Sequence, residues 1–201
     1  MHPCVISAHK LNMPHNNNLA RENYLAACAI WSDISLHLPI LKAHADMCDH
    51  VTEFGVRDGQ SSRAILASNA QHIRMYDLML HDQVQLLVDD SLQAGKDVTY
   101  SQADTRSLVI EPTDMLFVDT LHTYEQLKTE LNLHAPNVNR FMAFHDTHTF
   151  GLVDEPGYSG PGLLPALLEW LSANPTWRIS YHDWRNNGFT VVEKHAHIRG
   201  T

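Results

Sequence analysis

The order of hydrophobic and polar positions predicts alternating strands and helices through most of the chain. Short apolar or β-rich runs predict five strands, at residues 50–55, 72–77, 98–103, 114–119 and 141–145. Stretches with helical spacing lie between them, at residues 60–69, 82–94 and 124–134. Strands that alternate with helices are typical of βαβ units, which build a parallel sheet. We therefore expect an α/β fold.

The two ends of the chain depart from this alternation. Residues 1–18 lack sustained periodicity and contain three consecutive asparagines, which predicts a loose arm. Helices are expected over residues 19–31 and 39–48, the second with a proline in its first turn. Further along, a loop rich in glycine and proline precedes a predicted helix and two strands joined by an Asn-Gly turn, which favours a hairpin. These elements span residues 151–162, 163–173, 177–183 and 188–193.

The composition is that of one folded domain. The chain has 201 residues, of which 44% are hydrophobic and 18% charged. This length suffices for one sizeable core but not for two domains of ordinary size. We therefore expect the arm at residues 1–18 and a single domain at 19–201, with N-terminal helices at 19–48 and an α/β core at 49–194.

Charge and cysteine usage narrow the expected partners and compartment. Fourteen basic and 23 acidic side chains give a net charge of −9, which repels nucleic acid and anionic lipid. No apolar run approaches the roughly 18 residues of a membrane span, so we expect no membrane partner. The cysteines Cys4, Cys28 and Cys48 form no C-x-x-C pair, and no signal-peptide pattern is present. We therefore expect a reducing, cytoplasmic setting.

A turn with two glycines follows the first expected strand. Gly55 and Gly59 let the backbone turn tightly and let a ligand approach it. The N-terminus of the next helix offers N–H groups and a positive dipole end to a carboxylate. Because glycine turns are common in α/β proteins, this feature alone leaves open whether a ligand binds there.

Acidic residues lie at the ends of neighbouring strands. Asp77 comes about 20 residues after the turn, where an acid commonly holds ribose hydroxyls, and Asp104 ends the next strand. Ligands of open parallel sheets bind beyond the carboxyl ends of the strands, so Glu53, Asp77, Asp104 and Asp119 are expected to face one crevice. Four acids suit a cofactor with a ribose, a sulfonium and no phosphate. Alternatively, Asp77 and Asp104 only cap the following helices.

Three segments resemble class I S-adenosylmethionine-dependent methyltransferases. Residues 53–61 (EFGVRDGQS) resemble their motif I in the form E-x-G-x-x-x-G-x-S, although Arg57 stands where the commonest version has a third glycine. Residues 117–125 (FVDTLHTYE) resemble an F-I-D-x-x-H-x-Y-E stretch, and residues 143–147 (AFHDT) the acidic segment after strand five. The matching branch includes macrocin-type sugar O-methyltransferases and cephalosporin-hydroxylase-like proteins. The resemblance covers roughly residues 49–194.

The resemblance implies a Rossmann-like methyltransferase fold. Its mostly parallel, seven-stranded sheet has a C-terminal antiparallel hairpin and helices on both faces. The resemblance also implies an S-adenosylmethionine site with cofactor-binding residues Glu53, Gly55, Gly59, Ser61, Asp77 and Asp104. The expected reaction is O-methylation of a small-molecule or sugar hydroxyl, in a pocket built by the N-terminal helices and the 150–162 loop. The sequence does not decide between a monomer and a homo-oligomer.

Asp119 and His122 are the expected catalytic residues, because methyl transfer to a hydroxyl requires placement of the oxygen and removal of its proton. His122 is expected to take that proton, unless it is a loop histidine that caps the helix beginning at Tyr124. The sugar-modifying relatives hold magnesium with the acid matching Asp119 and an acidic pair after strand five. Here His145 replaces one of that pair beside Asp146, so the expected divalent ion is magnesium, manganese or zinc.

Two alternatives to a methyltransferase remain open at this point. A metal-dependent hydrolase could be built on His122, His145, Asp146 and His148, although the strand-like run before His145 argues against the all-helical phosphohydrolases with an His-Asp pair. The other alternative is a non-catalytic Rossmann-like binding protein that has kept the fold and lost the chemistry.

Overall fold

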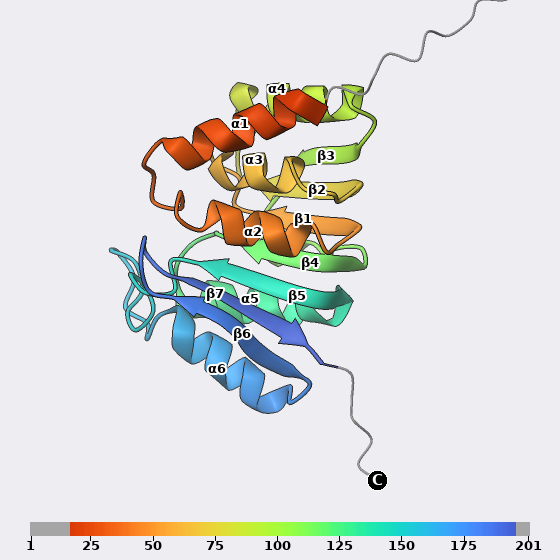
Figure 1. The fold of residues 1–201 in the computed structure, drawn as a ribbon. Coiled ribbons are helices and arrows are strands. Elements are labelled where there is room, and N and C mark those ends of the chain that lie inside the picture. The colour runs from red at the N-terminus through yellow and green to blue at the C-terminus, as the bar shows by residue number, and fades with distance from the viewer. Residues whose placement is uncertain (1–16, 196–201) are drawn as a thin grey trace, which may run out of the picture.

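A single seven-stranded sheet forms the centre of the computed structural model, which describes residues 17–195 (Figure 1). Its strand order is β3-β2-β1-β4-β5-β7-β6. The parallel strands are β1 (His50–Phe54), β2 (His72–Asp77), β3 (Asp97–Gln102), β4 (Thr113–Val118) and β5 (Val138–His145). β7 (Phe189–Lys194) runs antiparallel between β5 and β6 (Trp177–Asp183). The predicted parallel sheet and C-terminal hairpin are confirmed.

Helices cover both faces of the sheet (Figure 1). One face carries α1 (Asn17–Ala29), α2 (Leu38–Ala45), α3 (Gln60–Leu66) and α4 (Asp82–Gln93); the other carries α5 (Tyr124–His134) and α6 (Leu163–Ala173). Successive strand residues point to opposite faces, so Met115 and Phe117 pack in one core while Leu116 and Val118 pack in the other. Because helices cover both faces of the central strands, most residues of β1, β4 and β5 are buried. No helix of residues 17–195 has the length and apolar character needed to cross a membrane.

Most predicted elements end within two residues of the observed limits. β5 begins at Val138 instead of residue 141, because the exposed Asn139 and Arg140 interrupt its apolar pattern. α2 and α3 each end three residues before the predicted limit, at Ala45 and Leu66. α1 begins at Asn17, inside the predicted arm, and the rest of that arm lies outside the described residues.

The sheet places a candidate ligand site at the carboxyl ends of its parallel strands. From β1 the chain crosses to β2 on one side, whereas β4 pairs with β1 on the other. A crevice forms at such a change of direction, and ligands of open α/β sheets bind there. The short 3₁₀ helix η1 (Thr105–Ser107) follows β3 at the same edge, and η2 (Ala135–Asn137) precedes β5 at the opposite edge.

Candidate cofactor and catalytic site

The turn after β1 lies against the chain that leaves β4. Gly55 has a φ of 79°, and a Cβ at this position would overlap the carbonyl oxygen of Asp119. Gly59 has a φ of 78° and immediately precedes α3. Gly55 therefore allows two adjacent strand ends to approach more closely than any other residue would permit.

Asp77 stabilises this turn as well as ending β2. Its Oδ2 accepts hydrogen bonds from the N–H groups of Val56 and Arg57, both at 2.8 Å. Its Oδ1 accepts one from Met79 at 3.0 Å. Asp77 therefore does not act as a simple cap of α4, which begins five residues later at Asp82.

Asp104 shows the capping role that the sequence left open. Its Oδ1 accepts a hydrogen bond from the N–H of Arg106 at 2.9 Å, and its carboxylate pairs with the Arg106 guanidinium at 2.8 Å. These contacts lower the pKa of Asp104, with the side-chain hydrogen bond from Arg106 as the largest cause. Asp104 also lines the cavity beyond the strand ends.

Glu53 lies behind the turn and not in the cavity. It is fully buried and accepts hydrogen bonds from the hydroxyls of Ser61 at 2.5 Å and Ser62 at 2.8 Å. Burial raises the pKa of Glu53 to about 8, although the two serine hydrogen bonds oppose this shift. Glu53 therefore connects β1 to the start of α3, while Ser61 borders a small hollow beside Gly55.

A cavity of about 430 Å³ brings the other predicted cofactor residues together. It lies across the ends of four parallel strands and has polar and apolar walls. Its lining includes Gly55, Arg57, Tyr76, Asp77, Leu78, Ala103, Asp104, Thr105, Arg106, Asp119, Thr120, Leu121, His122, Gln126 and Tyr158. Three predicted cofactor residues do not line this cavity: Glu53, Gly59 and Ser61.

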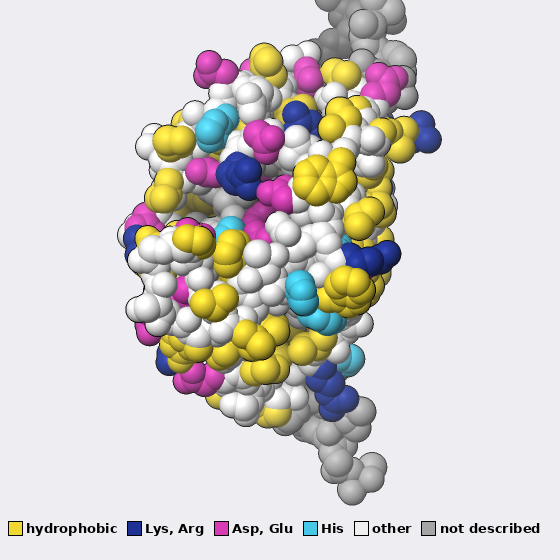
Figure 2. Space-filling view, turned by 90° about the vertical axis from the view of Figure 1, so that its left-hand side faces the viewer, with side chains coloured by type: hydrophobic (Ala, Val, Ile, Leu, Met, Phe, Trp, Pro, Cys, Tyr) yellow, Lys and Arg dark blue, Asp and Glu magenta, His cyan; other side chains and the backbone are white. Residues whose placement is uncertain are grey.

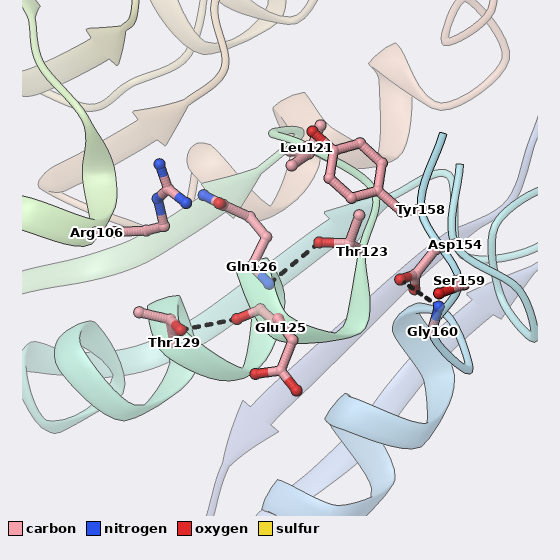
Figure 3. Close-up of a pocket in the computed structure, with 10 residues that line it drawn as sticks. All are labelled: Arg106, Leu121, Thr123, Glu125, Gln126, Thr129, Asp154, Tyr158, Ser159 and Gly160. Atoms are coloured by element: carbon pink, nitrogen blue, oxygen red, sulfur yellow. Dashed lines mark hydrogen bonds between the residues drawn. The ribbon is translucent and has the colours of Figure 1, made fainter. Parts of the chain in front are cut away.

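A second hollow of about 440 Å³ adjoins the cavity at the start of α5 (Figure 3). The two spaces share Arg106, Leu121, Gln126 and Tyr158. Thr123 caps α5, accepting a hydrogen bond from the N–H of Gln126 at 3.2 Å. This is half of a capping box, because the Gln126 side chain donates to Glu130 and not to the N–H of Thr123.

A cluster of two histidines and three carboxylates lies where β4 and β5 end. His122 Nε2 is 3.2 Å from Asp119 Oδ1 and 2.9 Å from Asp146 Oδ2, while its Nδ1 is 2.9 Å from Glu155 Oε2. His145 Nδ1 lies 3.4 Å from Asp119 Oδ2 and 3.3 Å from Asp146 Oδ2. The carboxylates of Asp119 and Asp146 therefore lie between the two imidazoles.

The close packing of opposite charges shifts the pKa values of this cluster. Burial lowers the pKa of both histidines, but their contacts with Asp119 and Asp146 outweigh it and raise each pKa to about 10. Burial raises the pKa of the two aspartates, and the histidine contacts outweigh it and lower both. Without a further ion in the cluster, both imidazoles are therefore protonated at neutral pH.

The side chain of His122 makes no cap for α5. The N–H of Tyr124 donates to Asp154 Oδ1 at 2.9 Å, and the N–H of Gln126 donates to the Thr123 hydroxyl at 3.2 Å. The His122 ring stacks on Phe150 instead, with ring centroids 4.9 Å apart. Its position between carboxylates therefore does not serve to begin the helix.

The donor set of Asp119, His145 and Asp146 fits a divalent ion. One ligand atom from each lies within 4.8 Å of the other two. His145 Nε2 lies 3.1 Å from the carbonyl oxygen of Asp33 and therefore donates, which leaves Nδ1 facing the carboxylates. Both His145 Nδ1 and Asp146 Oδ1 are buried and have no hydrogen-bond partner within the described part of the chain.

Two residues that contact the cluster, Glu155 and Asp33, were not predicted from the sequence. The alternative hydrolase site also lacks one of its four expected residues, His148. Glu155 and Asp33 come from irregular connections whose sequences carry no motif, so only their partners in the cluster could have pointed to them. His148 is exposed and lies edge-on to Trp184 at 6.1 Å, so it does not join the other members of the proposed hydrolase site.

Solved structures resemble this chain along nearly its whole length. A putative O-methyltransferase from Klebsiella pneumoniae has 16% identity and a TM-score of 0.60, covering 94% of this chain and 93% of that one. The fold is that of methyltransferases. An O-methyltransferase from Bacillus cereus in complex with S-adenosylhomocysteine (SAH) has 13% identity and a TM-score of 0.62, covering 92% and 93%.

A third similar structure is that of magnesium protoporphyrin IX methyltransferase from Synechocystis PCC 6803 with bound SAH. It has 15% identity and a TM-score of 0.60, and the match covers 90% of this chain and 96% of that one. No protein-family model and no curated protein matches the sequence. The similarity to these three solved structures confirms the predicted Rossmann-like methyltransferase fold.

Proposed function

We propose that this chain is an S-adenosylmethionine-dependent O-methyltransferase that acts on a small-molecule hydroxyl. The observation that carries the proposal is one cavity lined by Gly55, Asp77 and Asp104 on one side and by Asp119 and His122 on the other. Its volume of about 430 Å³ lies within the range of small-molecule sites. The SAH held by two structures of the same fold supports this assignment of the cavity.

The cavity offers partners for the ribose, the purine and the sulfonium of the cofactor. Asp77 Oδ1 accepts a single hydrogen bond, and a carboxylate oxygen has room for a second one from a ribose hydroxyl. Leu121 and Tyr158 offer apolar contact to a purine. When bound, S-adenosylmethionine supplies an electrophilic methyl group, and the carboxylate of Asp119 complements its positive charge.

We propose that His122 takes the proton of the acceptor hydroxyl and that neighbouring side chains orient the His122 ring. Glu155 holds Nδ1 at 2.9 Å and Phe150 stacks on the ring, so Nε2 is aimed toward Asp119 and Asp146. Nε2 accepts a hydroxyl proton only after losing its own, and that loss determines when the enzyme is active. Asp119 positions the acceptor oxygen beside the cofactor.

Asp119, His145 and Asp146 would hold the divalent ion. When bound there, the ion would acidify the acceptor hydroxyl. Because this set mixes nitrogen with oxygen donors, we propose manganese or zinc over magnesium. Elemental analysis of the purified chain should find the ion, and His145→Ala should lower the ion content, whereas His148→Ala should leave it unchanged. Undiminished methyl transfer in excess chelator would remove the ion from the mechanism.

Calorimetric titration tests the cofactor assignment. SAH should bind the wild type, and Asp77→Ala should weaken binding at least tenfold through the lost ribose contact and the loosened turn. Asp89→Ala, which removes an exposed acid from α4, is the matched control and should bind as wild type does. If the folded wild type binds a nicotinamide dinucleotide and not SAH, the methyltransferase proposal is wrong.

The acidic surface and the cysteine pattern support two further proposals. A net charge of −9 disfavours nucleic acid as the acceptor. Three cysteines without a C-x-x-C pair favour a cytoplasmic location.

A further inference from the structure

Large hydrophobic side chains are exposed mainly at the edge where the parallel strands end. Of the seventeen exposed in residues 17–195, ten lie in the connections at that edge and two, Met47 and Val109, in those at the opposite edge. Figure 2 looks onto the first edge and shows hydrophobic side chains around a hollow in which acidic, basic and histidine side chains are visible. Six of the ten, which we call the apolar rim, are Ile30, Trp31, Leu36, Leu152, Val153 and Trp184.

The apolar rim comes from three connections that are fastened together. Asn186, in the β6–β7 connection, accepts a hydrogen bond from the N–H of Leu36 at 2.9 Å and donates to the carbonyl of Ser32 at 2.8 Å. The carbonyl of Asn187 accepts from the N–H of His148 at 2.8 Å. Two of these connections also contact the cluster, because His145 Nε2 lies 3.1 Å from the carbonyl oxygen of Asp33 and 3.3 Å from that of Asn186. The connections that carry the rim are therefore held beside the cluster.

The charges near the rim disfavour an anionic acceptor. Arg57 pairs with Asp33 at 3.1 Å and Arg185 pairs with Asp183 at 2.6 Å, so a neighbouring carboxylate already balances the charge of each guanidinium. The cluster itself contributes three carboxylates, those of Asp119, Asp146 and Glu155, against the two imidazoles of His122 and His145. When no divalent ion is bound, the carboxylates are in excess, and an anionic acceptor meets net repulsion.

We infer that the acceptor is an uncharged hydroxyl compound with an extended apolar body, which covers the apolar rim while its hydroxyl reaches His122. This inference rests on the proposed methyltransferase function and replaces a sugar as the expected acceptor. A sugar would leave side chains such as Trp31, 84% exposed, and Leu152, 77% exposed, in water. Each buried CH₂ group strengthens binding by up to about fourfold.

The test uses 4-methylphenol, 4-butylphenol and 4-hexylphenol, titrated calorimetrically into the full chain saturated with SAH. Affinity should rise about two- to fourfold for each CH₂ group. Leu152→Ser should weaken 4-hexylphenol binding about fivefold or more while 4-methylphenol changes little. Leu168→Ser is the matched control, because Leu168 is 53% exposed but lies on α6, away from the rim.

Several results would overturn the inference. One is an affinity independent of chain length, or equal losses in Leu152→Ser and Leu168→Ser. Another is tighter binding of methyl glucoside than of 4-hexylphenol. Sedimentation that shows a dimer dissociated by Leu152→Ser would assign the rim to a second copy of the chain. Failure to bind SAH contradicts the methyltransferase proposal, whereas SAH binding without a chain-length effect contradicts only this inference.

Discussion

The chemistry of the proposed site depends on the protonation of His122. Its contacts with Asp119 and Asp146 raise its pKa to about 10, so the ring is mostly protonated at pH 7 when no ion is bound. If His122 is the base, turnover should rise about tenfold per pH unit from pH 7 toward pH 10, since only the neutral ring accepts a proton. Initial rates with labelled cofactor and an alkylphenol acceptor measure this profile.

The same assay distinguishes the base from a structural histidine. His122→Ala should lower turnover by about 10²- to 10⁴-fold near pH 9 while SAH affinity stays nearly unchanged. A bound divalent ion would withdraw charge from the two aspartates and move the profile to lower pH. A wild-type rate in His122→Ala would show that another group takes the proton.

Glu53 gives the stability of the chain a pH dependence of its own. Burial raises its pKa from 4.5 to about 8, so between these values the native state holds a proton that the unfolded state has released. The free energy of unfolding attributable to Glu53 therefore falls as pH rises through this range. Glu53→Gln should remove the decline and exceed the wild type by roughly 1–4 kcal/mol at pH 8.5.

Urea unfolding at pH 5 and pH 8.5 measures the Glu53 effect. Glu125→Gln, an exposed change on α5, is the control and should keep the pH dependence of the wild type. Equal pH dependence in Glu53→Gln and the wild type would mean that Glu53 is already ionised in the folded chain at pH 5.

At the residue scale, the sequence indicates the site residues that belong to motifs, but it does not indicate the residues outside the motifs that contact them. Asp119, His122, His145 and Asp146 follow strands at recognisable spacings, and the structure brings these four together. Glu155 lies 33 residues after His122 in an irregular loop, where no period constrains its direction. Glu53 belongs to the motif, but its alternation along β1 turns it toward α3 and away from the cavity.

Among the elements, the turn from β1 to α3 tolerates the least change. Gly55→Ala would add a Cβ against the Asp119 carbonyl and force an alanine to a φ of 79°. We expect a loss of about 2–5 kcal/mol of unfolding free energy and of SAH binding. Gly157→Ala is the matched control, because its φ is 101° but no atom lies within 4 Å of the added Cβ.

Thermal denaturation with and without SAH measures both glycine variants. Gly157→Ala should lose only the backbone term, about 1–2 kcal/mol, and should still bind SAH. If Gly55→Ala is no less stable than Gly157→Ala, the close approach of β1 and β4 is not what requires the glycine.

Element boundaries follow from the sequence only where local pattern and tertiary contacts agree. α5 has the limits that its helical spacing predicts, and the cap that Thr123 provides in the structure agrees with that start. β5 begins earlier than its apolar run, because pairing with β4 extends the strand through Asn139 and Arg140. Pairing energy of this kind comes from a neighbouring strand, and no local window contains it.

For the whole molecule, the proposed function predicts a stabilisation by ligand. A ligand that binds only the folded chain adds about 2.7 kcal/mol at 100 times its dissociation constant. For about 200 residues this corresponds to a rise in Tm of roughly 5–10 °C with SAH. Differential scanning fluorimetry measures the shift, which should shrink in Asp77→Ala and persist in Asp89→Ala. An unchanged Tm in saturating SAH would contradict the assignment of the cavity.

The bonds of Asn186 also determine when the site can be completed. They join backbone groups of Leu36 and Ser32 to a side chain 150 and 154 positions later. A ribosome releases the α1–α2 connection long before its partner, and contacts of such sequence separation form late because closing the intervening loop costs entropy. A nascent chain can therefore pair its parallel strands while the proposed acceptor side is still open. Catalytic competence would then be acquired only after synthesis has passed β7, however early the sheet begins to fold.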